Sequence, residues 1–445
     1  MKKSSASINS DIRIRVQLAA VLIFLFAVQM MYPQENNSKE KKRGDYLTIK
    51  IAVMGPGDEL YFWWGHFGLI IEDSLSGISK FYDYGIFSFK KEHFFTNFAQ
   101  GRLVYSSAVS LAQRNIGWYV HNNRDITLYT LDLDAEQKEQ IQKTADFNAL
   151  PENSDYLYNH FKDNCVTRIL NMINDAVNGE FYDYAQSTEG RYTLRGHVKR
   201  HTYFSFFWDW LLNFVMGQDI DTKTTVMQEM FLPSEAGKQL ANFYYTDTGG
   251  NKRNLVSKTE IINRSVNRPP VLDAPKSFLL RSLIFGILVA AILAFLRLIS
   301  AKERNQNKLK KTARIIFAIT NTVLGLFLGI IGTLTCYMSF FTNHDYSYHN
   351  MNVLLLNPIL FIVFIFGIKS LFAKTEQKYL QACRIMQIVW TYIFCAGAAI
   401  MLLKLLPVFY QDNRTSLLIF MPISFVLSLL PNGFLYISKK TRGNK

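Results

Sequence analysis

Cys165 occupies a position in this sequence that suits covalent catalysis. It follows Asn164 in FKDNCVTRILNMINDAVNG (161–179), and apolar residues recur behind it at helical spacing. If Asn164 caps this helix, the thiol lies in the first turn, where backbone N–H groups and the positive end of the helix dipole stabilise a thiolate. The stretch therefore predicts an activated sulfur nucleophile.

A thiolate nucleophile needs a base that moves its proton, and histidine has a suitable pKa. His66 is the strongest candidate, because WWGHFGLIIED (63–73) places it on a predicted strand directly after a turn that contains glycine. The return strand carries Tyr82, Asp83 and Tyr84. Asp83 is the candidate third group, since a carboxylate can orient an imidazole.

Each of these assignments has a structural alternative. A lone cysteine is more often a small buried apolar residue, and Asp83 would then be a solvated acid at a hairpin edge. Arg168, one helical turn after Cys165, either holds a phosphate or carboxylate of a substrate or ties its helix to the domain. The chemistry predicted for Cys165 requires no metal and no diffusible cofactor.

The segments around these residues predict an α+β domain. Strands are expected at 46–53, 65–73, 80–89, 102–109 and 125–133, the second and third forming a hairpin. Asp134 is expected to cap a helix that begins with acidic residues, and Gly179 to end the helix that begins at Cys165. The aromatic stretch 200–215 predicts a core helix, with a segment at a membrane interface as the alternative.

Five long apolar segments follow this domain, and each is long enough to cross a hydrocarbon core of about 30 Å as a helix. They are residues 277–298, 315–338, 351–372, 385–409 and 416–437. Another apolar run, 16–32, follows a basic stretch, as in an export signal, and its weak cleavage site leaves a signal peptide and an uncleaved signal anchor equally open.

These segments divide the chain into five parts. The predicted parts are a signal segment at 1–32, a linker at 33–45, an exported domain at 46–275, a transmembrane bundle at 276–438 and a cytoplasmic tail at 439–445. Cys165 is the only cysteine of the exported domain, because the other three lie in or beside the apolar segments. No disulfide partner therefore competes for its thiol.

Lys and Arg residues predict the orientation, because they keep short flanking segments in the cytoplasm. They outnumber acids four to one in 1–15, six to one in 301–314, four to one in 369–384 and four to none in 438–445. The net charge of +14 therefore reports topology, and the nearly neutral exported domain excludes nucleic acid as a partner. We expect a multi-pass protein of the inner (cytoplasmic) membrane with its main domain on the periplasmic side.

The order of the candidate residues resembles the circularly permuted branch of the NlpC-type papain-like fold, which includes lecithin:retinol acyltransferase. There a strand with His precedes a polar residue and then a Cys at a helix N-terminus, although the polar residue is commonly a second His and here is Asp83. A longer set of motifs is similar to the Lnb family of bacterial membrane proteins: WGHFGLIIED, FYDYGIFSF, FAQGRLVY, NCVTR, LLNFVMGQDID and EMFLP.

This resemblance implies an α+β permuted papain-like periplasmic domain followed by an all-α membrane bundle of five helices. It also implies lipoprotein N-acylation, in which Cys165 moves a fatty acyl chain from a phospholipid to the N-terminal amine of a diacylated lipoprotein. His66 would be the base and Asp83 its orienting group. The supporting or substrate-binding positions would be Asn164, Arg168, Tyr82 and Tyr84.

Two other functions remain open from the sequence. One is a Cys–His hydrolase acting on cell-wall peptides or phospholipid, although a wall peptidase needs only a tether and five spans exceed that. The other is a lipid-binding or scaffold module with an inert cysteine.

Overall fold

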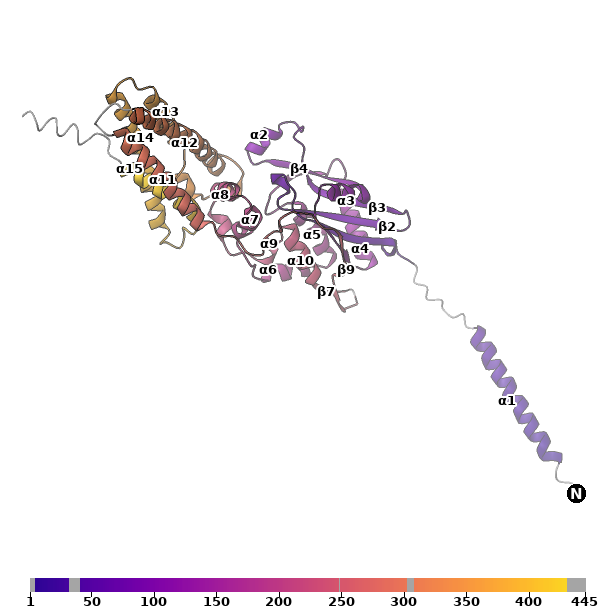
Figure 1. Cartoon of the computed structure of the whole chain (residues 1–445). Helices are drawn as coiled ribbons and strands as arrows, with labels where there is room; N and C mark the ends of the chain where they lie inside the picture. The colour runs from indigo at the N-terminus through magenta and orange to yellow at the C-terminus, as the bar shows by residue number, and fades with distance from the viewer. Residues whose placement is uncertain (1–4, 32–40, 248, 302–307, 430–445) are drawn as a thin grey trace, which may run out of the picture.

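The computed structural model describes residues 5–31, 41–247, 249–301 and 308–429 of the chain. These residues form a helix α1 (Ser5–Met31), an N-terminal domain built on a β-sheet, and a helical bundle (Figure 1). Helix α1 contains the apolar run of the predicted signal segment. Most of the predicted linker and all of the predicted tail lie outside the described residues.

Seven antiparallel strands form the sheet of the N-terminal domain, in the order β6-β4-β3-β2-β1-β5-β9. Five of them correspond to the predicted strands: β1 (Leu47–Met54), β2 (His66–Asp73), β3 (Ile78–Ile86), β4 (Leu103–Leu111) and β5 (Ile126–Leu131). The sequence analysis missed β6 (Asp155–Tyr158) and β9 (Val256–Asn263), which are the two edge strands. β9 is largely exposed and mostly polar, and β6 has only four residues, so neither shows a clear strand pattern.

Helices cover both faces of this sheet. The larger core lies under α4 (Ala135–Asn148), α5 (Cys165–Ala176), α6 (Glu180–Ser187) and α10 (Pro233–Asn242). The smaller core lies under α3 (Ala112–His121). Because successive residues of a strand point to opposite faces, Phe67 and Leu69 of β2 enter the larger core and Ile70 enters the smaller one.

The aromatic stretch 200–215 connects the N-terminal domain to the bundle. It divides into the end of α7 (Leu194–Thr202) and α8 (Phe206–Val215), so the single predicted helix is wrong. Trp210 and Phe214 of α8 belong to the core of the bundle, and the Trp210 indole donates to Ser416 at 3.2 Å. Trp210 and Phe214 are thus buried, but against the bundle, while Phe204, Phe207 and Trp208 are 50%, 42% and 37% exposed.

The bundle is a ring of five helices in which each helix packs on the next and the last returns to the first. The helices are α11 (Leu279–Ala301), α12 (Lys308–Phe341), α13 (Leu360–Leu371), α14 (Glu376–Leu403) and α15 (Arg414–Leu429). By length and composition α11, α12 and α14 can cross a membrane, and the described parts of α13 and α15 are shorter.

The predicted span 351–372 is wrong in its length. Only α13 is an α-helix there, and it follows a short 3-10 helix, η5 (Met351–Leu354). Pro358 disfavours a helical conformation at the residue before it. The amide of Asn352 also donates to the Phe214 carbonyl at 2.9 Å, which holds the segment against α8.

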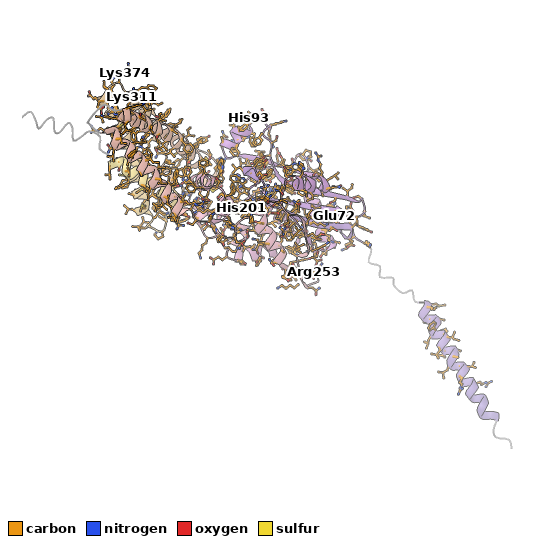
Figure 2. The ribbon with its side chains drawn as sticks, viewed as in Figure 1. Glu72, His93, His201, Arg253, Lys311 and Lys374 are labelled. Atoms are coloured by element: carbon orange, nitrogen blue, oxygen red, sulfur yellow. The ribbon has the colours of Figure 1, made fainter. Side chains whose placement is uncertain are left out.

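Basic residues of the bundle gather away from the N-terminal domain. Lys311 and Lys374, from two of the loops predicted to be cytoplasmic, both lie at the end of the bundle that is remote from the sheet (Figure 2). The five helices thus separate these lysines from the domain that carries Cys165, as the charge pattern requires.

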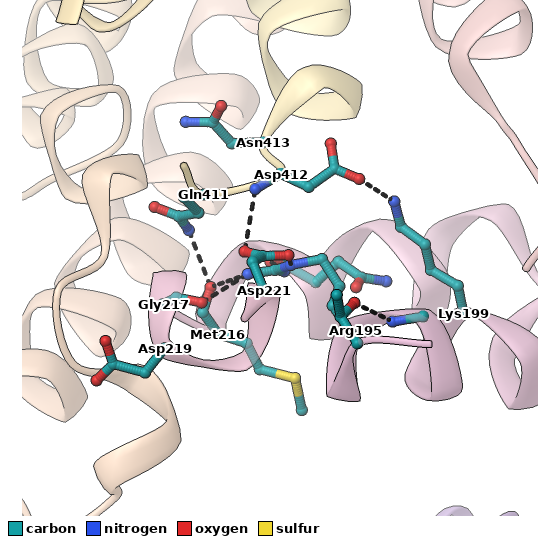
Figure 3. Close-up of polar contacts among 12 residues, drawn as sticks. Arg195, Lys199, Met216, Gly217, Asp219, Asp221, Gln411, Asp412 and Asn413 are labelled. Carbon is teal, nitrogen blue, oxygen red and sulfur yellow. Dashed lines mark hydrogen bonds and ion pairs between the residues drawn. The ribbon is translucent and has the colours of Figure 1, made fainter. Parts of the chain in front are cut away.

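A buried polar network joins the two parts (Figure 3). Arg195 of α7 pairs with Asp221 at 2.7 Å, and both side chains are less than 10% exposed. Asp221 also accepts the backbone N–H of Asp412 at 3.0 Å, and the Lys199 amine lies 2.7 Å from the Asp412 carboxylate. Breaking a buried ion pair costs about 3–5 kcal/mol, so these contacts fix the N-terminal domain on the loop that precedes α15.

Candidate active site

The hairpin of β2 and β3 brings His66 and Asp83 together. In the register of this pair, Gly68 lies opposite Asp83, so His66, two residues earlier, is a diagonal neighbour on the same face. The His66 Nε2 atom lies 2.6 Å from an Asp83 carboxylate oxygen, and the side chains are 16% and 19% exposed. Asp83 is therefore no solvated hairpin acid.

Tyr119, Arg124 and Phe62 form a stack on one side of the His66 imidazole. The Tyr119 ring of α3 lies parallel to His66, with centroids 6.1 Å apart. The Arg124 guanidinium lies over Tyr119 at 4.8 Å and over Phe62 at 4.7 Å. Both Nη atoms of Arg124 are buried and, among the described residues, have no hydrogen-bond partner; burial lowers the pKa of Arg124. The stack fixes the plane of the imidazole and places a buried cation near the site.

The surroundings of His66 favour its charged form. Burial by itself lowers the pKa of His66, but the interactions with Tyr119, the Asp83 carboxylate and the Cys165 sulfur outweigh burial. The pKa of His66 is therefore held well above its usual value. An imidazolium beside a thiol is the state in which a thiolate–imidazolium pair forms.

Asn164 caps helix α5, as the sequence predicted. Its side-chain oxygen accepts the backbone N–H groups of Val166 and Thr167 at 2.9 and 3.1 Å. Two amides of the first turn are thus occupied by the cap. The Cys165 N–H is the amide of this turn that lacks a partner within the described part of the chain.

The thiol approaches the sheet at Gly85. Cys165 begins a helix that covers one face, whereas His66 and Asp83 point to the other face. Strand β3 is bulged between Tyr84 and Ile86, and Gly85 adopts a φ of +84°. A Cβ on Gly85 would lie 3.7 Å from the Cys165 Cβ. The bulge therefore brings the first turn of α5 to the end of the sheet, where the two faces meet.

Cys165 is buried, with 7% of its surface exposed. Its electrostatic interaction with the imidazole contributes to the raised pKa of His66. Because Nε2 is bonded to Asp83, Nδ1 is the imidazole atom left for proton exchange with the thiol. Catalytic hydrogen bonds commonly tighten only when substrate is bound.

Two tyrosines of β6 complete the site, and the sequence analysis missed both. The Tyr156 hydroxyl is buried without a partner among the described residues, and a Cβ on Gly85 would lie 3.8 Å from it. Burial and then the Cys165 charge raise the pKa values of Tyr156 and Tyr158. The alternation of DYLY, ten residues before the cysteine, was the available signal.

The other predicted residues have structural contacts. Tyr82 and Tyr84 point into the larger core, away from Asp83, and the Tyr82 hydroxyl donates to Asp146 at 2.6 Å. Arg168 forms two hydrogen bonds of 2.6 Å to Asp163, and its guanidinium lies 4.1 Å from the centre of the Tyr156 ring. Arg168 thus holds Tyr156 and the loop before Cys165 in place.

A charged cavity lies away from the Cys165 site. Its volume is about 370 Å³, and it lies where α7 meets the first turns of α11 and α15. Arg191, Lys199, Lys276 and Arg414 line it, and no residue of the Cys165 site does. Among the described residues, no cluster of His, Cys, Asp and Glu side chains has the arrangement of a metal site.

Fold and site together define a membrane protein whose N-terminal domain carries a His–Asp pair and, at the Gly85 bulge, a cysteine in the first turn of a covering helix. The model of the Lnb N-terminal periplasmic domain matches residues 34–197, and the model of the Lnb transmembrane domain matches residues 276–411. The chain belongs to the Lnb family, which confirms the family resemblance predicted from the sequence. The short name of the second model denotes five transmembrane helices. Neither the curated proteins nor the solved structures contain a significant match.

Replacing Asp83 by Asn should slow the alkylation of Cys165 by iodoacetamide near neutral pH. Without the carboxylate the pKa of His66 falls, so the imidazole is neutral at a pH where it would otherwise balance the thiolate. One pKa unit corresponds to about a tenfold loss of rate. At high pH the difference should vanish, because the imidazole is then neutral in both proteins. Intact-mass time courses measure this rate.

Glu72→Gln is the matched control, because Glu72 lies at the other end of β2 and pairs with Lys50. It should leave the rate of alkylation unchanged. Equal pH profiles for Asp83→Asn and the unaltered protein would show that the carboxylate does not act on the thiol through His66.

Proposed function

We propose that this protein is a thiol-dependent lipoprotein N-acyltransferase of the inner membrane, whose N-terminal domain has a circularly permuted papain-like fold and lies on the periplasmic side. The observation that carries the proposal is the 2.6 Å contact between His66 and Asp83, close to a thiol in the first turn of α5. The link to lipoproteins rests on the resemblance to the Lnb family. The same chain order, His66, Asp83 and then Cys165, supports the permuted fold.

In the first half-reaction the Cys165 thiolate attacks the carbonyl carbon of a phospholipid acyl ester. A C–S bond forms, and the carbonyl oxygen becomes an oxyanion. When the tetrahedral intermediate collapses, the ester C–O bond breaks and the His66 imidazolium donates its proton to the leaving alkoxide. The products are a lysophospholipid and an acyl thioester on Cys165, with His66 neutral.

The oxyanion needs donors that are already in place. The Cys165 N–H and the Tyr156 hydroxyl are suited to this role, since both lie beside the sulfur and neither has a partner among the described residues. A buried hydroxyl without a partner is costly. An oxyanion between these two groups would supply the missing acceptor.

In the second half-reaction the α-amine of a diacylglyceryl-cysteine, at the N-terminus of the lipoprotein, attacks the thioester. Neutral His66 takes the proton that the attacking nitrogen must lose, and the C–S bond breaks to release the Cys165 thiolate. The product is an N-acylated lipoprotein, and the thiolate–imidazolium pair is restored. Asp83 holds the imidazole and balances its charge in both half-reactions.

Contacts between the active-site loop and the bundle support a lipid donor. Asp345, in the loop between α12 and α13, accepts from Asn159 at 3.2 Å and from Lys162 at 2.7 Å. His160 packs edge-on against Tyr346 of the same loop, and burial lowers the pKa of His160 to about 4. The residues directly before Cys165 are therefore tied to an end of the membrane bundle.

Cells in which Cys165→Ala replaces the natural protein should lose the N-acyl chain of their lipoproteins. Mass spectrometry of lipoprotein N-terminal peptides should find two acyl chains in place of three. Cys395→Ala is the control, because Cys395 is an exposed residue of α14, and it should leave three. An unchanged acyl number with Cys165→Ala would refute the proposal. Fatty acid released by the purified protein without N-acylation would indicate a hydrolase.

Replacing Tyr156 by Phe should lower the rate of N-acylation by roughly 10²–10³, the effect typical of losing one oxyanion donor. The alkylation of Cys165 by iodoacetamide should not change, since this reaction builds no oxyanion. Measuring both rates separates a donor from a packing residue. Equal losses in both reactions would mean that Tyr156 only shapes the site.

A further inference from the structure

An exposed aromatic cluster lies on the N-terminal domain between β3 and β4. It consists of Phe87, Phe89, Phe94, Phe95 and Phe98, which we call the aromatic rim. Three of its members lie on or beside the short helix α2 (Phe94–Ala99) and are largely open to solvent: Phe89 is 56% exposed, Phe95 71% and Phe98 47%. Contiguous exposed rings of this kind mark a surface that contacts a membrane or a partner.

A continuous row of rings leads from the aromatic rim to the thiol. The Phe89 and Phe94 centroids are 5.1 Å apart, and Phe94 and Phe87 stack at 6.1 Å. Phe87 stacks on Tyr105 of β4 at 5.2 Å, and Tyr105 stacks on Tyr158 of β6 at 4.4 Å. The row therefore runs from helix α2 and the segment before it onto β4 and β6, two adjacent strands of the sheet.

The row ends beside Cys165. A Cβ on Gly85 would lie 3.2 Å from the Tyr158 ring and 3.7 Å from the Cys165 Cβ. Tyr158 is thus the last ring before the sulfur. A row of aromatic side chains of this kind offers an apolar surface against which a long hydrocarbon chain can pack.

The loop that follows α12 contacts one edge of the aromatic rim. The Phe98 ring lies 6.2 Å from His344, and the Gln100 carbonyl accepts the Asn343 N–H at 2.9 Å. Both partners belong to the loop that follows α12 directly. Figure 1 places α2 among the elements nearest to the bundle, and Figure 2 shows His93 on that side, with Glu72 at the opposite end. The aromatic rim therefore lies level with one end of the apolar helices.

We propose that the aromatic rim is immersed in the lipid leaflet beside the bundle and that the row of rings binds an acyl chain of a membrane phospholipid whose ester reaches Cys165. The immersion rests on the exposed rings and their contacts with the loop after α12, and the assignment of the chain as acyl donor rests on the proposed function. Aromatic side chains are enriched at membrane interfaces. Lys90, on the exposed loop between Phe89 and α2, suits phosphate headgroups.

A photo-crosslinker tests the immersion. The full-length protein carries p-benzoylphenylalanine in place of Phe95, in a Cys165→Ala background that cannot form the thioester, and is irradiated in its native membrane. We expect an intact-mass increase of one phospholipid. The same crosslinker in place of Phe147, a 59% exposed residue of α4, is the matched control and should give no lipid adduct.

A second variant tests the role of the aromatic rim in the reaction. Phe95→Glu should lower the fraction of triacylated lipoprotein and leave iodoacetamide alkylation of Cys165 unchanged, whereas Phe147→Glu should change neither. An adduct with a protein, or no lipid adduct at position 95, would overturn the inference. A lipid adduct at position 95 would uphold the immersion even if Cys165→Ala leaves lipoprotein acylation intact, and that second result would overturn only the proposed function.

Discussion

The site depends on the hydrogen bond between His66 and Asp83, because it sets both the direction and the charge of the imidazole. The two side chains meet only if β2 and β3 pair with Gly68 opposite Asp83. A register shift of one residue would send Asp83 to the opposite face. The cores on both faces of the sheet enforce this register, since Phe67 and Leu69 fill one and Ile70 fills the other.

The second constraint is the approach of helix α5 to the end of the sheet. Cys165 and the His66–Asp83 pair start from opposite faces, and they come close because β3 is bulged at Gly85. With a φ of +84°, this position disfavours any residue other than glycine. The missing side chain also leaves room for the Tyr156 hydroxyl and the Tyr158 ring beside the thiol. The bulge at Gly85 therefore influences the positions of Cys165, the Tyr156 hydroxyl and the Tyr158 ring.

The bundle contributes more than attachment to a membrane. Its loops hold the N-terminal domain at two places, through Asp412 at the α7 side and through Asp345 at the loop before Cys165. Gly217 shows how closely the parts fit, since a Cβ there would clash with the Tyr348 carbonyl oxygen. These contacts hold the domain that carries Cys165 in a fixed position relative to the apolar helices.

Local signals made much of the site predictable. The predicted hairpin put His66 and Asp83 on adjacent strands, and Asn164 correctly predicted the start of α5. What the sequence could not predict depends on partners distant in the chain: Tyr119 comes from helix α3, Arg124 from the segment after it, and Tyr156 from an edge strand of four residues. For the same reason the shortened helix α13 escaped prediction, because Asn352 is held by Phe214.

The most direct test of the central claim is the mass of Cys165 in protein extracted from its membrane. If the Cys165 sulfur carries the acyl group from a phospholipid to a lipoprotein, a peptide containing Cys165 should gain the mass of one fatty acyl chain. Hydroxylamine should remove this added mass. Asp83→Asn should lower the acylated fraction. An unmodified Cys165 in a protein that still N-acylates lipoproteins, or an adduct that resists hydroxylamine, would contradict the thioester mechanism.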